Sequence, residues 1–413
     1  MQRRRKRGNP LRILVLLALV AGALYINQVV VPATPPLFIP TPTPTRSPDS
    51  FILDAQTLVQ EGKINQAIET YKQAVEADPR NPAVYLTLAR WQILYGDYEG
   101  GMENVQNALL LNDNNSLAHA VRGWVLGKQG NYLEGEAEIK TALELDPNSA
   151  LAYAYLAEIY KDKIDAGKED FNTRDLAAEV SRKALELDSS LFEVRRARGL
   201  VLEVTGNYEQ AIVEFEAAVK MNSNLADLHL ALGRNYKAVD AYDKAVEQFN
   251  MAISFKPDDP DPYAELARTY LTVGEYAKGV QLAEQAVEKD PTDPLLHSLL
   301  GTLYFRNGDY KTSLKNLRLA ARGGFTDDGK PVEGIPIENN LTAINLYSRY
   351  GIALANAGEC GEALQVSQAL SDTVPDDENA AYNAQVMIDT CRELAENPVV
   401  ETEEPEVEET PQP

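Results

Sequence analysis

A residue pattern that recurs every 34 positions constrains this chain more than any other feature. Its clearest copy runs from Asn207 to Val219 as NYEQAIVEFEAAV, which has the periodicity of an amphipathic helix. Near-copies begin at Lys63, Asp97, Asn131, Ala241, Glu275, Asp309 and Glu359. A fixed period in this range indicates a repeat protein, in which each unit buries its apolar face only by stacking on its neighbours. The sequence therefore predicts a solenoid that presents an extended surface for binding.

Small residues recur at two fixed positions in the second helix of each unit. The first series is Ala67, Gly101, Gly135, Ala177, Ala211, Ala245, Gly279, Ser313 and Ala363. The second series is Ala74, Ala108, Ala142, Ala184, Ala218, Ala252, Ala286 and Ala320, and Leu370 replaces it in the ninth unit. Residues seven apart lie on one helix face, so we expect helices to approach closely there. The first helix of several units carries Leu-Gly or Leu-Ala followed by Tyr, as in Leu232-Gly233 with Tyr236.

These residues resemble the tetratricopeptide repeat, whose Trp, Leu-Gly, Tyr, Ala, Phe, Ala and Pro positions occur in this order and with this period. The resemblance implies an all-α, right-handed superhelical solenoid of about nine helix-turn-helix units with a C-terminal capping helix at about 378–396. The units begin near residues 48, 82, 116, 150, 192, 226, 260, 294 and 344. The resemblance is specific for the fold but says little about function, because the same scaffold serves many partners.

Two departures from the period divide the solenoid. The fourth unit is lengthened by a charged stretch from Asp162 to Asn172, which we expect to extend the corner between its helices. Units 1–8 are expected within 49–321, and the ninth unit with the capping helix within 344–396. Between them, the glycines and prolines of 322–343 predict an irregular loop. Such a loop is either a tolerated insertion or a binding element on a rigid scaffold.

The start of the chain has the composition of a membrane anchor. Residues 1–12 are basic and residues 13–31 are mostly apolar, which predicts a cytoplasmic N-terminus and one transmembrane helix. Nineteen residues rise about 28 Å as a helix, close to the roughly 30 Å of a hydrocarbon core. Because basic residues stay in the cytoplasm, we expect the solenoid outside it, at the cell membrane. The alternative is a signal peptide cleaved near Ala21-Gly22-Ala23, which would release a secreted protein.

Two further segments lack the composition of a folded core. Residues 32–48 are rich in proline and threonine and predict a stiff stalk of about 50 Å in the polyproline II conformation. Residues 397–413 contain six glutamates and are expected to be a disordered acidic tail. This tail serves either for solubility or as a recognition segment.

The formal net charge of the chain is −23 at pH 7. Nucleic acids and anionic surfaces would be repelled by such a charge, so we expect neither as a partner. The expected ligand is a protein or peptide, with a bias toward basic or apolar ones.

In the resembled fold the first helices line the concave groove, and the position one turn past the first-helix aromatic holds Arg90, Arg234 and Arg268. Lys237 lies one turn beyond Arg234. These cations are candidates for contact with a partner, and Arg234, Lys237 and Arg268 would form a patch that accepts a carboxylate or an acidic peptide. The alternative is that they pair with nearby acids such as Glu265. Some members of the family hold a C-terminal carboxylate with Lys and Asn at set positions. The corresponding positions of the first three units hold Ile52, Gln56, Thr87, Leu117 and Val121, so that clamp is absent.

The sequence offers little support for catalysis. His119, His229 and His297 occupy one position of three separate units, where other units have a packing tyrosine, so a shared metal is not expected. Glycine-rich phosphate loops, zinc-protease motifs and nucleophile elbows are absent from the sequence. We therefore expect neither an enzyme nor a bound cofactor.

The two cysteines predict a staple at the end of the solenoid. Cys360 begins the second helix of the ninth unit, and Cys391 ends the capping helix that should pack antiparallel to it. In an exported domain they would form a disulfide, and two free thiols are the alternative.

Together these features predict a membrane-tethered scaffold for protein–protein interaction that binds its partner on the concave face. The alternative function is that of an assembly factor or chaperone for exported, pilus or envelope proteins.

Overall fold

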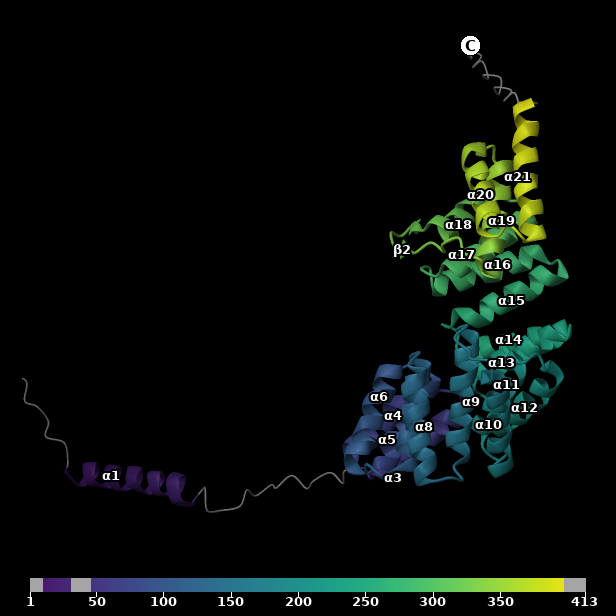
Figure 1. The fold of residues 1–413 in the computed structure, drawn as a ribbon. Coiled ribbons are helices and arrows are strands. Elements are labelled where there is room, and N and C mark those ends of the chain that lie inside the picture. The colour runs from purple at the N-terminus through teal and green to yellow at the C-terminus, as the bar shows by residue number, and fades with distance from the viewer. Residues whose placement is uncertain (1–9, 31–45, 397–413) are drawn as a thin grey trace, which may run out of the picture.

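The computed structural model describes residues 10–30 and 46–396. Within these ranges the chain is helical apart from one short pair of strands, and the helices from α3 onward follow one another as stacked pairs (Figure 1). The prediction of an all-α architecture of stacked helix pairs is therefore confirmed. The predicted stalk lies outside the described residues except for its last three, and the acidic segment 397–413 lies wholly outside them.

The described part of the chain contains nine helix pairs, which we number as units 1–9. The first helices are α3 (Pro48–Gln60), α5 (Pro82–Leu94), α7 (Ser116–Lys128), α9 (Ala150–Asp165), α11 (Phe192–Val204), α13 (Ala226–Ala238), α15 (Pro260–Val273), α17 (Pro294–Asn307) and α19 (Leu341–Asn356). The second helices are α4 (Ile64–Ala77), α6 (Tyr98–Leu111), α8 (Tyr132–Leu145), α10 (Thr173–Leu187), α12 (Tyr208–Met221), α14 (Tyr242–Phe255), α16 (Tyr276–Lys289), α18 (Tyr310–Arg322) and α20 (Cys360–Thr373). Helix α21 (Glu378–Glu396) follows unit 9.

Caps and glycines determine where these helices begin and end. Asn81, Asn115 and Ser149 each accept a backbone N–H at the start of a first helix. Proline occupies the first turn of α3, α5, α15 and α17, where its missing N–H has no partner to lose. After the first helix of every described unit the backbone passes through a positive φ, at a glycine in eight units and at Asp240 (φ 60°) in unit 6.

The small residues of the repeat lie where the two helices of a unit meet. Ala211 and Ala218 of α12 have no exposed surface, and the same is true of Ala245 in α14. In unit 6, Gly233 lies against the ring of Phe249, where an added Cβ atom would come within 2.6 Å of a ring carbon. The repeat pattern therefore marks the contact between helices within each unit.

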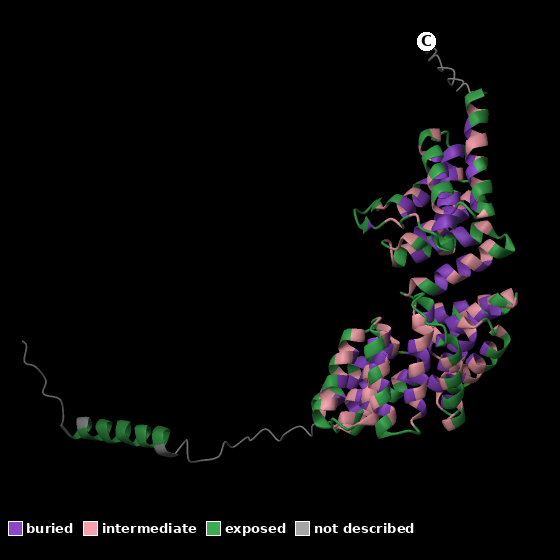
Figure 2. Cartoon of the chain, in the orientation of Figure 1, coloured by how far each residue is buried: buried purple, intermediate pink, exposed green. Residues whose placement is uncertain are grey.

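The N-terminal helix α1 (Pro10–Tyr25) has 16 residues and continues into one π-helical segment, η1 (Ile26–Val30). Most of this helix is coloured as exposed in Figure 2, and its exposed residues include the apolar Leu16 and Leu19. The segment 13–31, expected to form a transmembrane helix, falls on these two elements and on residue 31, which is not described. A search of residues 10–30 and 46–396 finds no helix whose length and apolar character suffice to cross a bilayer.

Units 1–6 form a closed turn, because units 1 and 2 return to contact units 5 and 6. One apolar cluster joins Tyr71 of unit 1 and Leu88 of unit 2 to Phe215 and Phe249 of units 5 and 6. The ring of Trp91 stacks on that of Phe192, with centroids 6.1 Å apart. These units make the compact lower block of Figure 1. We call the contact between units 1–2 and units 5–6 the seam.

Polar contacts also cross the seam. The side-chain amide of Asn224 donates to the carbonyl oxygen of Gln60, and these residues are 164 positions apart. The Lys256 ammonium lies 5.3 Å from the centre of the Tyr95 ring. The seam is therefore held by stacking, hydrogen bonding and cation–π contact as well as by apolar burial.

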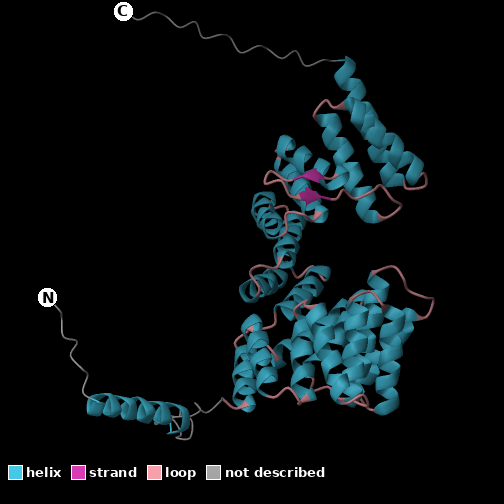
Figure 3. Ribbon diagram, turned by 90° about the vertical axis from the view of Figure 1, so that its left-hand side faces the viewer, coloured by secondary structure: helices cyan, strands magenta, loops and turns pink. Residues whose placement is uncertain are grey.

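Units 7–9 and α21 continue beyond the closed turn as the upper part of the molecule (Figure 1). The insert after unit 8 is more ordered than the irregular loop that its composition predicts, because it contains strands β1 (Gly324–Phe325) and β2 (Pro331–Val332), paired antiparallel (Figure 3). Its turn is held by the Thr326 backbone N–H, which donates to the carbonyl of Lys330. The Tyr347 hydroxyl lies 3.0 Å from the carbonyl oxygen of Ala321 and 2.9 Å from that of Ile335, which anchors the start and the middle of the insert on α19.

Candidate partner-binding groove

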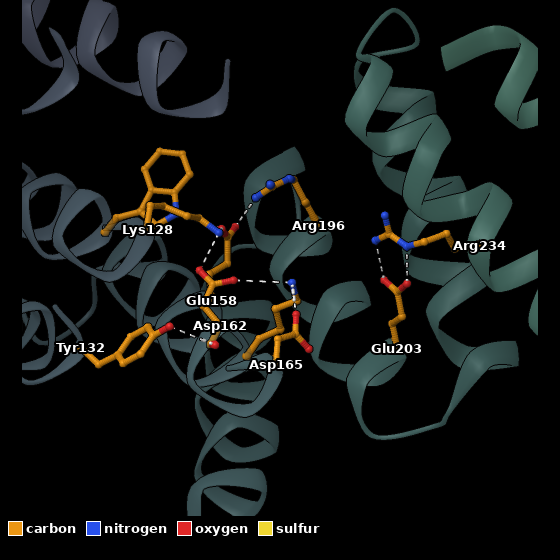
Figure 4. Close-up of polar contacts among 10 residues, drawn as sticks. Lys128, Tyr132, Glu158, Asp162, Asp165, Arg196, Glu203 and Arg234 are labelled. Carbon is orange, nitrogen blue, oxygen red and sulfur yellow. Dashed lines mark hydrogen bonds and ion pairs between the residues drawn. The ribbon is translucent and has the colours of Figure 1, made fainter. Parts of the chain in front are cut away.

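The first helices of units 3–5 carry charged side chains that pair with one another. Glu158 of α9 has no exposed surface and lies between cations from the two neighbouring units. Its carboxylate pairs with Arg196 of α11 and lies 3.1 Å from the Lys128 ammonium of α7 (Figure 4). The Trp124 indole N–H donates to the same carboxylate at 2.8 Å. Lys128 also reaches Asp162 at 2.8 Å.

Electrostatics inside this cluster favour the charged forms. Burial alone would raise the pKa of Glu158, but Arg196, Lys128 and the Trp124 indole together lower it to about 2. Burial lowers the pKa of Arg196 and of Lys128, yet their carboxylate partners raise both above their ordinary values. The cluster is therefore a satisfied ionic network that links units 3, 4 and 5, and it leaves no open anion site at these positions.

Arg90, one of the predicted contact residues, lies in the same closed turn. Its guanidinium pairs with Glu193 of α11, whose side chain is only 4% exposed. Tyr155 and Glu193 both raise the pKa of Arg90. Arg90 therefore joins unit 2 to unit 5.

The other three predicted cations lie on neighbouring first helices, and each has a carboxylate partner. Arg234 of α13 donates from Nε and Nη2 to the two oxygens of Glu203, at 2.7 and 3.2 Å (Figure 4). Glu265 of α15 accepts from Lys237 and from Arg268, the latter at 3.1 Å. Burial raises the pKa of Glu265. The charges of Lys237 and Arg268 lower this pKa by more than burial raises it, so the net shift is downward. Pairing with Glu265 was the alternative that the sequence left open for these cations.

Arg268 also lines a pocket of about 270 Å³ on the first helices of units 7–9. We call this the C-terminal pocket. It is lined by Arg268, Leu271, Leu295, Ser298, Leu299, Thr302, Thr342, Asn345 and Arg349. None of these residues is acidic, although the chain as a whole is at −23. The pocket therefore combines two guanidinium groups, four hydroxyl or amide side chains and an apolar wall of three leucines.

Arg349 is the least neutralised cation of the C-terminal pocket. Its Nη1 lies 3.4 Å from the Thr302 hydroxyl, which is the only hydrogen bond of its side chain among the described residues. Burial, and then the charge of Arg306 nearby, lower the pKa of Arg349. A carboxylate placed in the pocket would relieve this repulsion and gain charge-assisted hydrogen bonds.

The sequence pointed to Arg268 but missed Arg349, Asn345 and Thr302. The prediction rests on the position one turn past the first-helix aromatic, whereas Arg349 lies two residues before the small residue Gly351. A usable signal was present, because Arg349 has no acidic residue three or four positions away on its helix, whereas Arg268 has Glu265.

The three histidines are structural. Each ring bridges its two helices and the preceding turn, as His229 does with the Gln248 side chain at 2.7 Å and the Ser223 carbonyl at 2.8 Å. His119 and His297 make the same kind of contacts in units 3 and 8. Among residues 10–30 and 46–396, no three or more His, Cys, Asp or Glu side chains converge on a possible metal position.

The structure joins Cys360 to Cys391 by a disulfide, with Cα atoms 5.5 Å apart. This bond ties α21 to the start of α20. It lies in the units that carry the C-terminal pocket and fixes the helix that closes the solenoid.

Comparison with known proteins agrees with the repeat. Models of the tetratricopeptide repeat match residues 58–125, 205–270 and 238–303, and a second such model matches 118–149. The chain contains tetratricopeptide repeats. Repeats of this kind generally serve protein interaction rather than catalysis. A search of curated protein sequences finds no match.

Solved structures of other proteins are similar to this chain. The human IFIT1 dimer with m7Gppp-AAAA has 17% sequence identity and a TM-score of 0.51, with 85% of this chain and 83% of IFIT1 covered. PilF of Pseudomonas aeruginosa has 23% identity and a TM-score of 0.43, with 51% of this chain and 92% of PilF covered. A tetratricopeptide repeat protein of Parabacteroides merdae has 16% identity and a TM-score of 0.39, with 62% and 98% covered. At these identities the likeness concerns the fold alone.

Proposed function

We propose that this protein is a non-enzymatic interaction scaffold that holds an acidic segment of a polypeptide partner on the first helices of units 7–9. One observation carries the proposal. The charged side chains Arg90 and Arg196 of units 2–5 are engaged in internal ion pairs, whereas the C-terminal pocket presents Arg349, which has no ion pair among the described residues, beside Arg268, whose partner Glu265 is not part of the lining. This contrast supports partner binding at the last three units.

The chemistry of the pocket defines the partner. Guanidinium groups bind carboxylates through paired, charge-assisted hydrogen bonds, and Ser298, Thr302 and Asn345 supply further polar contacts. Leu271, Leu295 and Leu299 offer an apolar wall beside these groups. The matching ligand is a peptide in which acidic and small apolar residues lie next to each other.

We further propose that residues 13–31 anchor the protein in the cell membrane, with the solenoid outside the cytoplasm. The basic residues 1–12, the apolar composition of 13–31 and the exposed leucines of α1 support this arrangement. The Cys360–Cys391 disulfide also supports it, because such bonds persist mainly in oxidising compartments. Secretion after cleavage of the first segment is the alternative. N-terminal sequencing and protease protection of intact cells separate the two.

Crosslinking in intact cells tests the scaffold. Captured proteins are identified by mass spectrometry for the wild type, for Arg268→Glu/Arg349→Glu and for Arg80→Glu. Arg80 is an exposed arginine outside the pocket, so this variant controls for reversing a surface charge elsewhere on the protein. The proposal expects one dominant partner that is lost from the double variant and retained by the control.

Two results would count against it. If the double variant still captures the dominant partner, the C-terminal pocket is not part of the binding interface. A diffuse set of secreted clients would favour the assembly factor or chaperone. Circular dichroism of each variant shows whether a loss of binding reflects a loss of fold.

A further inference from the structure

Helix α21, which precedes the acidic segment in the sequence, packs on the element that carries Arg349. Helix α21 packs on α19 and α20, and Met387 of α21 fills the space beside Gly351 of α19. The Ser367 hydroxyl of α20 donates to the carbonyl of Ala384 at 3.1 Å, and the disulfide ties the end of α21 to α20. The helix that ends at Glu396 is therefore fixed to unit 9.

The segment from 401 to 409 has the composition that the C-terminal pocket fits. Its sequence is ETEEPEVEE, in which Glu404, Glu406 and Glu408 alternate with Pro405 and Val407. Alternate residues of an extended peptide point to opposite sides. A peptide bound in that way would turn carboxylates toward Arg268 and Arg349 and small apolar groups toward the leucine wall.

The length of the segment permits this contact. Helix α21 has 19 residues and rises about 28 Å. The eight residues from Glu396 to Glu404 span at most about 28 Å when extended, and the twelve to Glu408 span about 42 Å. The segment can therefore run back along the whole of α21 toward α19.

Charge favours the same place. The surface as a whole repels an acidic segment, since the net charge is −23. The C-terminal pocket is an exception, with Arg268 and Arg349 in its lining and Arg306 close enough to lower the pKa of Arg349.

We propose that residues 401–409 occupy the C-terminal pocket of their own chain and compete there with the acidic partner. This rests on the proposed function, because it assigns a self-ligand to the same site. A tethered segment competes at an effective concentration in the millimolar range. A partner must therefore bind the pocket strongly enough to displace the internal segment. Alternatively, it binds a molecule of this protein whose segment is held at another site.

The experiment uses the full chain and a fluorescein-labelled hexaglutamate peptide as probe, with binding followed by fluorescence anisotropy. The test variant is Glu404→Gln/Glu406→Gln/Glu408→Gln. The matched control is Glu99→Gln/Glu103→Gln/Glu134→Gln, which removes three exposed charges far along the chain from the pocket. Each is measured with and without Arg349→Glu.

The test variant is expected to bind the probe on the order of tenfold more tightly than the wild type, as a millimolar effective concentration against an internal affinity near 0.1 mM requires. The control variant should bind like the wild type, and Arg349→Glu should abolish binding in every background. The gain should shrink as salt is raised.

Other outcomes overturn the proposal in distinguishable ways. If the wild type and the test variant bind the probe with equal affinity, and Arg349→Glu still abolishes binding, the internal segment does not occupy the pocket. The proposed function is then unaffected. A gain that depends on protein concentration shows that the segment of a second copy occupies the pocket. Absence of probe binding in all backgrounds overturns the acidic ligand and the self-ligand together.

Discussion

At the scale of single residues, Glu158 shows how the inside of the closed turn accommodates charge. It is fully buried, yet two cations and an indole N–H surround its carboxylate. Removing one partner of such a cluster leaves the others buried without compensation, which typically costs about 3–5 kcal/mol. The network therefore makes the packing of units 3–5 sensitive to a single side chain.

Glu158→Gln tests this at two pH values. At pH 7 we expect it to lower the free energy of unfolding by about 3 kcal/mol. Because folding lowers the pKa of Glu158 from 4.5 to about 2, its contribution is complete above about pH 4.5 and is lost as pH falls toward 2. The difference between variant and wild type should therefore narrow between pH 4.5 and pH 2 in urea unfolding. A constant difference would contradict the assigned pKa.

Asp240 is a second residue whose environment is readable. It occupies the position at which the other units have glycine, with φ at 60°. Aspartate and asparagine tolerate this conformation, whereas a β-branched residue is strained there by roughly 1–2 kcal/mol. Asp240→Val should lower the urea midpoint accordingly, and Asp240→Asn should leave it close to that of the wild type. Equal stability of the two variants would show that the turn relaxes.

Sequence reasoning reached some of these residues and not others. Arg268 was found because its repeat position faces the groove. Its pairing with Glu265 was also foreseen as an alternative, since these residues are three apart on one helix. Glu158 was not singled out, because its partners Lys128 and Arg196 are 30 and 38 positions away. Such contacts depend on how neighbouring units are placed.

At the scale of elements, the capping helix depends on its covalent tie. Helix α21 packs on α19 and α20 of unit 9, with Ala380, Ala384 and Met387 buried. The Cys360–Cys391 bond closes a loop of 31 residues. In the chain-entropy model such a loop contributes about 3–4 kcal/mol.

Reduction of the disulfide should therefore loosen α20 and α21 selectively. Hydrogen exchange is expected to speed up in these two helices on addition of reductant, while the helices of units 1–6 keep their protection. Cys360→Ser/Cys391→Ser should show the faster exchange with and without reductant. Equal protection of oxidised and reduced protein would mean that packing alone holds the cap.

The limits of the helices were largely predictable, and the insert was not. Local signals such as Pro260 and Pro294 at helix starts and Gly274 and Gly308 at helix ends act within a few residues. Strands β1 and β2 are two residues each and depend on pairing across the insert and on Tyr347 of α19. A residue pattern read over a few neighbouring positions does not show which distant residues will pair, so it could not predict these strands.

At the scale of the whole molecule, the closed turn of units 1–6 decides which surface is available. Closure brings Arg90 to Glu193 and Trp91 to Phe192. A sequence of nine similar units predicts one groove along the whole solenoid. Closure of units 1–6 removes the part of that groove that these units would contribute. The repeat pattern sets the contact between successive helices, but the path of the solenoid adds up small rotations over six units, so closure was not predictable from the sequence.

Arg90→Glu/Trp91→Ala should open the seam. The substitution places a carboxylate opposite Glu193 and removes the stacked ring, which together cost several kcal/mol. We expect a larger radius of gyration in small-angle X-ray scattering and faster hydrogen exchange in α3, α5 and α11. Arg80→Glu serves as the control and should scatter like the wild type. An unchanged scattering curve from the double variant would show that the apolar cluster alone closes the turn.

The seam also has a consequence for how the protein is made. The carbonyl of Gln60 cannot accept its hydrogen bond from Asn224 until that residue has been synthesised, 164 residues later. At about 5–20 residues per second, translation needs roughly 8–33 s to reach it. During that interval the apolar face of unit 1, including Tyr71, lacks its partners from units 5 and 6. Ribosome-bound chains that end before unit 6 should therefore expose the apolar face of unit 1, which is buried in the complete protein. We expect chaperones to bind the nascent chain at this face.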